Sequence, residues 1–321
     1  MVDLSPLADT HRLLFAVGLR PLQGSRFQPT GFPSLGPATF QTASGTSLLV
    51  ESAQSMANRL ENVLWDEGEQ SPIADVQGIS HVTITRGGAF FTDTMLEAHR
   101  LNSPYLLEGS NKDFSTQLQE ELKVLSEGPI DRRQLATILL KYDVNSLLHG
   151  VFLAKKELAG GRLRITRALS AFVEADGVRV APAGGVKNDH VNPSGDTGKG
   201  YGNVPFARDE FTADRIVLFA NLDLALLRGY GLGPDAEKLL VLLALYKLRA
   251  LLDGGLRFRT ACDFELVETD VIATRPSGFA LPSREQLAPA LRAAIQACSD
   301  RMVSSTHAYE DKLTKGKGEA V

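Results

Sequence analysis

Apolar residues recur at steps of three and four along a stretch near residue 55, and this spacing predicts an amphipathic helix. The residues at this spacing are Leu49, Ala53, Met56, Ala57, Leu60 and Leu64. Residues 44–47 include serines suited to cap the helix, and its end is expected near Trp65. Its outer face carries hydroxyl and amide groups instead of the Glu and Lys side chains that usually cover a solvated helix.

Alternation of apolar and polar residues predicts several strands, with Gly-containing turns between them. The segments with this pattern are 37–42, 146–156, 161–175, 177–183, 213–227 and parts of 256–273. Two further helices are expected at 236–255 and, despite Pro289, at 284–300. The order strand, helix, several strands, helix, strand is that of a split βαβ unit, so the predicted class is α+β with a ferredoxin-like core. RNA-recognition modules use this core.

Three segments break the pattern. Residues 66–136 mix short apolar runs with acidic helical pieces and are interpreted as an insertion. Residues 184–206 contain six glycines, few aliphatic residues and no periodicity, which is typical of a functional or mobile loop. Residues 301–321 end in a charged, Gly-containing tail that is expected to be disordered.

The 321 residues carry a net charge of −4, so bulk charge gives no sign of a nucleic-acid partner. The distribution is uneven: residues 61–127 hold twelve acidic and four basic side chains, whereas residues 151–187 hold seven basic and three acidic ones. Such a chain can present a basic surface, although chance clustering explains the same numbers. No apolar run has the length of a membrane span and no signal peptide is evident, so a cytoplasmic protein is expected.

Motifs for cofactor or metal chemistry are missing from the sequence. The GDTGKG segment at 195–200 fails the P-loop pattern, because Pro193 stands where Gly is required and Gly200 where Ser or Thr is required. The histidines form no HExxH motif and the two cysteines form no CxxC pair. We therefore expect no cofactor, no metal and no catalytic residue. Asp189 and Asp196 could support ribonuclease chemistry, though a solvated loop aspartate is the commoner case.

The polar face of the first predicted helix suggests a binding function. Steps of three, four and three place four side chains on one face, with two amides beside it: Ser52, Ser55, Arg59 and Asn62, flanked by Gln54 and Asn58. Hydroxyl, amide and guanidinium groups bond phosphate and sugar oxygens without reading base sequence. The face therefore suits a nucleic-acid backbone or another subunit. The alternative is a helix packed inside its own protein, with these groups capping loops.

Several segments together resemble one known family. They are RFQPTGFPSLGPATF, LLVESAQSMANRLENVLWD, SLLHGVFLAKK, RITRALSAFVEA and LRFRTACDFELVE. They look like the backbone subunit of type I-G (also called I-U) CRISPR Cascade effector complexes, a member of the RAMP superfamily. The resemblance covers most of 26–268, and VESAQSMANRLE and FQPTGFP are its most specific parts. The segment 66–136 and the tail carry little of it.

The resemblance implies a hand-shaped protein with a modified ferredoxin-like, RRM-like palm. The palm would be 1–65, 137–183 and 207–300, the finger-like insertion 66–136, and the extended thumb loop 184–206. Copies would polymerise along the guide crRNA, and the thumb of a neighbour would displace one nucleotide at regular intervals. The other bases would stay free to pair with target DNA in antiviral defence. Further implied partners are the Cascade large subunit and the subunits that cap the guide ends, with no membrane.

The resemblance and the polar face together indicate which residues are candidates for binding RNA. The palm candidates are Arg26, Gln28, Ser52, Gln54, Ser55, Asn58, Arg59, Arg257 and Arg259. The thumb candidates are Lys187, Asn188, His190, Lys199 and Tyr201. Arg162, Arg164 and Arg167 could meet phosphates or be solvated strand residues.

Two other functions stay open at this stage. Some type III RAMP backbone subunits cut target RNA with a loop aspartate, a role that would fall to Asp189 or Asp196 here. A generic RNA-binding module unconnected with CRISPR is the other. The charge distribution adds one hypothesis about assembly: the acidic stretch 61–127 of one copy would face the basic strands of the next.

Overall fold

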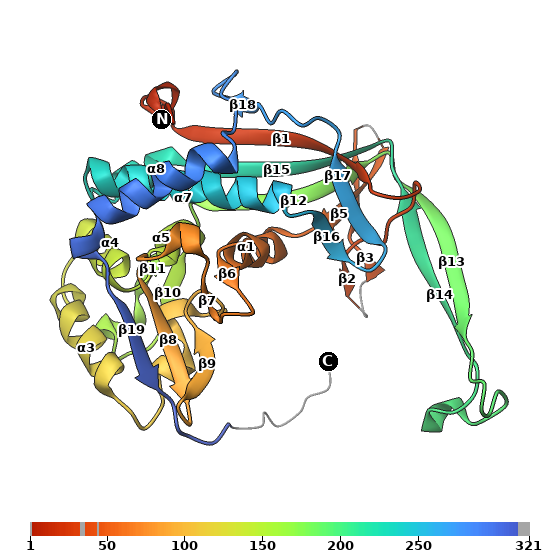
Figure 1. The fold of residues 1–321 in the computed structure, drawn as a ribbon, viewed down its shortest axis with the longest axis horizontal. Coiled ribbons are helices and arrows are strands. Elements are labelled where there is room, and N and C mark those ends of the chain that lie inside the picture. Colours follow the sequence, from red (N-terminus) through yellow and green to blue (C-terminus); the bar gives the residue numbers. More distant parts are fainter. Residues whose placement is uncertain (1, 33–35, 44, 314–321) are drawn as a thin grey trace.

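The computed structural model describes residues 2–32, 36–43 and 45–313. The fold is mixed α/β, and a curled antiparallel sheet crosses it in the order β16-β17-β1-β15-β12-β5-β4, with β18 paired to β1 (Figure 1). These strands are β1 Arg12–Pro21, β4 Thr39–Thr42, β5 Gly45–Glu51, β12 Leu169–Asp176, β15 Arg215–Asp223, β16 Leu256–Arg259, β17 Cys262–Leu266 and β18 Ala273–Arg275. A small hairpin of β2 (Gly31–Phe32) and β3 (Gly36–Pro37) lies beside the sheet.

Buried and half-buried residues alternate along the strands, and the buried ones face the helices that cover one side of the sheet. On β1 the buried residues are Leu13, Phe15, Val17 and Leu19, each separated by a half-buried one. Leu13 and Phe15 face Ala244 of helix α7 (Pro234–Asp253) across a void of about 10 Å³. Helices α1 (Ala53–Asn62) and α8 (Arg284–Ala297) pack against α7, and α6 (Leu224–Gly229) precedes it. The predicted helices at 236–255 and 284–300 are therefore confirmed.

A second group of helices and strands lies below the sheet in Figure 1. It contains β6 Trp65–Asp66, β7 Ser71–Pro72, β8 His81–Arg86, β9 Ala89–Asp93, α2 Pro104–Leu107, α3 Asp113–Leu122, α4 Arg132–Tyr142, α5 Asn145–His149, β10 Val151–Leu153 and β11 Leu163–Ile165. Strand β19 (Ser304–Ala308) completes it by pairing in parallel with β8.

The predicted disorder of 301–321 is wrong for residues 301–313. Besides the β19–β8 ladder, Tyr309 packs against Phe91 and Tyr105, with ring centroids 6.0 and 5.2 Å away. The Arg86 guanidinium also donates to the Asp311 carbonyl at 3.0 Å. These contacts are long-range, so the local composition gave no sign of them. Residues 314–321 lie outside the described part of the chain.

Two predicted boundaries also differ from the structure. The segment 146–156 was predicted as a strand, but it forms helix α5 followed by the short strand β10, because Gly150 turns the chain with φ of 81°. Residues 45–51 form strand β5 instead of the start of a helix, so Leu49 belongs to the sheet. Helix α1 begins at Ala53, with Ser52 as its N-cap.

The glycine-rich segment 184–206 is structured at both ends. Strands β13 (Arg179–Lys187) and β14 (Val204–Thr212) pair along their whole length and form a two-stranded ribbon that projects from the body (Figure 1). The prediction of a structureless loop is therefore wrong outside 188–203. Its strands lack an apolar period because, beyond the base of the ribbon where Phe211 is buried, neither face packs against the core. Among the residues that the structure describes, no helix is long and apolar enough to cross a membrane.

Candidate nucleic-acid interface

Helix α1 presents a polar face beside the end of strand β5. Ser52 starts the helix, and its Oγ accepts a hydrogen bond from the Ser55 backbone N–H at 3.2 Å. The buried side of the helix is Met56, Ala57, Leu60 and Glu61. The side chains of Gln54, Asn58 and Asn62 are exposed, and Gln54 Nε2 donates to Asn58 Oδ1 at 3.3 Å. The amides of the predicted face are therefore exposed at the α1 surface, and Gln54 Oε1 also accepts from Arg167 at 2.8 Å.

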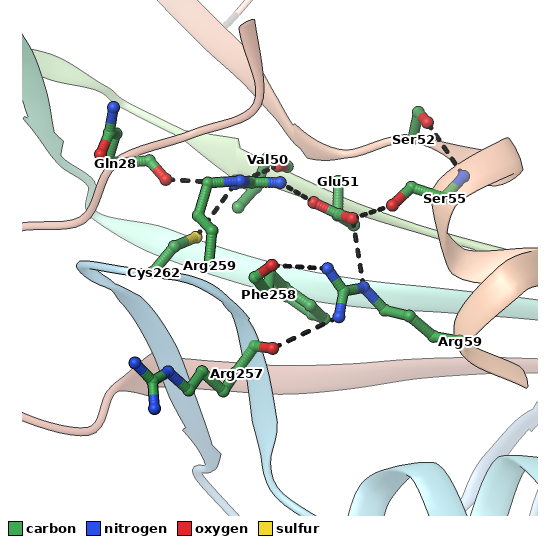
Figure 2. Close-up of polar contacts among 10 residues, drawn as sticks. All are labelled: Gln28, Val50, Glu51, Ser52, Ser55, Arg59, Arg257, Phe258, Arg259 and Cys262. Carbon is green, nitrogen blue, oxygen red and sulfur yellow. Dashed lines mark hydrogen bonds and ion pairs between the residues drawn. The ribbon is translucent and has the colours of Figure 1, made fainter. Parts of the chain in front are cut away.

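Ser55 and Arg59 of α1 are instead held by a buried carboxylate. We call Glu51, Ser55, Arg59 and Arg259 the Glu51 cluster (Figure 2). Glu51 is fully buried and accepts from the Ser55 hydroxyl, from Arg59 Nε at 3.2 Å and from Arg259 Nη2. A buried carboxylate requires such donors, because leaving it unpaired costs several kcal/mol, on the order of 3 or more. The cluster therefore fixes where β5, α1 and β16 meet.

The two arginines of the cluster also bond the backbone around them. Arg59 donates to the carbonyls of Arg257 at 3.3 Å and Phe258 at 2.6 Å, and its guanidinium lies 4.9 Å from the Phe258 ring centroid (Figure 2). Arg259 Nη1 donates to the carbonyl of Gln28 at 3.2 Å. The forked guanidinium suits such a junction, because it offers several donors in fixed directions.

Charge in the cluster does not balance, because two guanidinium groups share one carboxylate. About a quarter of each arginine side chain is exposed, 28% for Arg59 and 26% for Arg259. An excess positive charge therefore lies just under the α1 surface. Burial raises the pKa of the adjacent Cys262 thiol to about 12, and Arg259 offsets only part of this. The thiol stays protonated and supplies no nucleophile.

The predicted palm residues thus divide between internal and exposed positions. Four of them make contacts within the chain, which is the alternative that the periodicity had left open: Ser52, Ser55, Arg59 and Arg259. The backbone carbonyl of Gln28 accepts a hydrogen bond from Arg259. Arg257 is exposed, and its side chain points away from Glu51 (Figure 2). Arg26 is 54% exposed and lies 3.7 Å from Glu210 at the base of the ribbon.

The predicted thumb residues lie at the far end of the β13–β14 ribbon, away from α1 (Figure 1). Lys187, Asn188, His190, Lys199 and Tyr201 are all exposed there. The predicted RNA-binding residues therefore lie in two separate groups, one around α1 and one at the end of the ribbon.

Asp189 and Asp196 shape the loop that joins β13 to β14. Asp189 accepts backbone hydrogen bonds from Val191 at 2.9 Å, Asn192 at 3.0 Å and Gly202 at 2.8 Å, and these bonds lower its pKa. Asp196 accepts from the backbone N–H of Gly198 at 3.0 Å. In the described part of the chain, no three His, Cys, Asp or Glu side chains are grouped to hold a metal ion.

Sequence reasoning missed the groups that position α1. Glu51 gave no signal, because its partner Arg259 is more than 200 positions away along the chain. Arg167, which the sequence left ambiguous, donates to the Ala53 carbonyl at 3.0 Å and to Gln54 Oε1 at 2.8 Å. It therefore extends the α1 surface with a half-buried cation.

Comparisons with known proteins give two findings. The model of a family described as CRISPR-associated protein GSU0053 matches residues 13–180. The chain is also similar to a solved structure described as a CRISPR RNA-guided surveillance complex, pre-nicking, at 14% identity and a TM-score of 0.37, over 74% of this chain and 71% of that one. No curated protein sequence matches.

Proposed function

The chain belongs to the CRISPR-associated protein GSU0053 family, and from this premise we propose that it is a non-enzymatic guide-RNA-binding backbone subunit of a type I-G Cascade complex. Family membership supports a role in CRISPR defence. In this proposal copies of the chain line up along the crRNA and hold its backbone. The bases then remain available to target DNA.

The projecting β13–β14 ribbon is the observation that carries the proposal. Val180 and Val186 on one face of it are 56% and 53% exposed, and Val204 and Phe206 on the other face are 42% and 52% exposed. An isolated two-stranded ribbon is marginally stable in water, and clustered exposed apolar side chains mark interaction surfaces. A ribbon that exposes apolar side chains on both faces fits between two other molecules, as a thumb set between neighbouring copies and their guide would be.

The order of the central strands supports an RRM-like palm of the RAMP type. Taken in chain order, β1, α1, β12, β15, α7 and β17 give two strand–helix–strand units whose strands lie in the order β17-β1-β15-β12. This is the arrangement of a split βαβ fold.

The α1 surface supports binding that ignores base sequence. Gln54 and Asn58 offer amide donors and acceptors, and the excess charge of the Glu51 cluster lies beneath them. Such groups position a ribose-phosphate backbone without reading bases. A guide of variable sequence requires this kind of contact, because base pairing performs the recognition.

The test replaces only side chains that have no part in the Glu51 cluster. Gln54→Ala combined with Asn58→Ala is expected to lower the RNA recovered per milligram of complex purified from cells by about tenfold, since two backbone contacts per copy are lost. The matched control is Gln296→Ala, an exposed amide on α8. Normal RNA content in the double variant, with the control also normal, would show that α1 does not bind the guide.

A further inference from the structure

The β10–β11 hairpin exposes an aromatic ring beside a cation. Val151 and Leu153 of β10 are buried, so the alternation turns Phe152 outward, and it is 53% exposed. Arg164 of β11 lies directly across from Phe152 in the antiparallel pair and is exposed as well. Directly opposed residues project from the same face, so ring and guanidinium form one ridge.

A hollow lies on each side of this ridge, and both are lined by cations. One, of about 870 Å³, includes Arg132 and Arg162 in its wall. The other, of about 620 Å³, includes Arg167 and also Arg100, whose charge is already paired with Glu61. Phe152, Arg164 and Ile165 line both hollows. None of the described residues lining either hollow is Asp or Glu.

One arginine at this site is held by backbone carbonyls, and two buried polar atoms of the second hollow have no partner among the described residues. The Arg162 guanidinium donates to the carbonyls of Leu125 at 2.8 Å and Gly128 at 3.0 Å, which fixes its position. In the second hollow, His149 is only 3% exposed, and its Nδ1 finds no hydrogen-bond partner among the described residues. The buried Nε of Arg167 is in the same situation. Buried polar atoms normally have partners, so the lining of the second hollow contains hydrogen-bonding capacity that the described residues leave unused.

We propose that this ridge, Phe152 and Arg164 with the arginines of the two hollows, binds single-stranded nucleic acid. A base stacks on the Phe152 ring while Arg164 and Arg132 meet the phosphates on either side. Aromatic platforms flanked by cations bind single strands in this way without sequence preference. Only the identity of the bound strand rests on the proposed function. That strand is either the guide RNA or a strand of the opened target DNA.

Continuity with α1 favours a nucleic-acid strand over a protein segment. Arg167 lines the second hollow and donates to Gln54 on α1, so the ridge continues the surface proposed for the guide. The competing occupant is the acidic stretch 61–127 of a neighbouring copy.

Much of the charge in that acidic stretch is already neutralised within the chain. Ion pairs join Glu61 to Arg100, Asp75 to Arg292, Glu108 to Lys155 and Glu121 to Lys141. This leaves fewer carboxylates in 61–127 to face the ridge of another copy.

The first experiment titrates the full-length protein with labelled single-stranded RNA and DNA oligonucleotides of mixed sequence. Phe152→Ala is expected to weaken binding about tenfold with no change in salt dependence, and Phe152→Trp is expected to retain it, because the ring stacks. Arg164→Gln is expected to weaken binding and to reduce the slope of log affinity against log salt by about 0.7, one phosphate contact. The control is Arg275→Gln, an exposed arginine on β18.

Unchanged affinity in Phe152→Ala and Arg164→Gln would overturn the proposal, and so would a loss of self-association in these variants without a loss of oligonucleotide binding. The titration uses free oligonucleotides, so it can succeed or fail independently of whether the chain carries a guide in cells.

The second experiment identifies the strand. Photoreactive thio-bases are placed in the guide, in the target strand or in the displaced strand of the assembled complex, and crosslinked peptides are sequenced. A crosslink to the peptide containing Phe152 from any of these strands supports the site and names its ligand. Crosslinks elsewhere with none on β10 or β11 would overturn it.

Discussion

Replacing Glu51 by Gln is expected to lower the free energy of unfolding by about 3 kcal/mol, as breaking a buried ion pair does. Glu51 is fully buried and accepts hydrogen bonds from Ser55, Arg59 and Arg259. Glutamine keeps the size of the side chain but removes the charge, and its NH₂ group faces donors instead of acceptors. The two guanidinium groups would then repel each other without a carboxylate between them.

Urea denaturation of the purified protein measures this loss. The matched control is Glu265→Gln, whose side chain is 41% exposed and pairs with Arg20 at the surface. An exposed pair contributes little, so the control is expected to stay within about 1 kcal/mol of the natural protein. If Glu51→Gln were as mild as the control, the cluster would not hold α1, β5 and β16 together.

The buried amine of Lys247 is expected to make the free energy of unfolding rise with pH between about 7 and 10, relative to a variant that lacks this amine. Lys247 is fully buried in α7, and its Nζ lies 2.8 Å from Nε2 of the buried His149. Burial lowers the pKa of Lys247 from 10.5 to about 7. Between these values the unfolded chain binds a proton that the folded chain lacks. The free energy of unfolding therefore increases by about 1 kcal/mol per pH unit from this group.

Neighbouring buried groups titrate outside this window. Burial raises the pKa of Asp143 to about 6 and lowers that of His149 well below its usual value. Measurements between pH 7.5 and 9.5 are compared between variants, because burial also raises the pKa of the Cys262 and Cys298 thiols, which makes the stability fall over this range in every variant. Relative to the natural protein, Lys247→Met should lose a contribution that grows by about 2 kcal/mol over this range, while Lys238→Met, an exposed site on the same helix, should retain it. Parallel pH curves for the natural protein and Lys247→Met would show that Lys247 folds in its charged form.

Local sequence patterns predicted the helices whose apolar residues form a long run or recur at a regular spacing. The apolar run of α7 and the period of α8 each identified a helix. Residues 179–183 of the β13–β14 ribbon fell within a predicted strand, but the rest was hidden, because strands that are exposed on both faces have no apolar alternation to reveal them. Strand β19 was hidden for a different reason: its pairing with β8 joins residues more than 200 positions apart.

In the candidate site too, the sequence predicted what depends on local spacing and missed what depends on distant parts of the chain. Helical spacing identified Gln54 and Asn58 as outward-facing, and both are exposed. Spacing alone could not show that Arg59 turns toward Glu51 and Phe258, because that depends on where β16 passes the helix. Phe152 was missed for a similar reason, since its exposure follows from the short β10–β11 pairing after the turn at Gly150.

The most direct test of guide binding by α1 is to photo-crosslink RNA to protein in the assembly purified from cells and to sequence the crosslinked peptides. We predict crosslinks on the peptide that contains Gln54 and Asn58, and their loss in the double alanine variant. Abundant crosslinks to other parts of the chain with none on α1, or an assembly that contains no RNA, would contradict the proposed function.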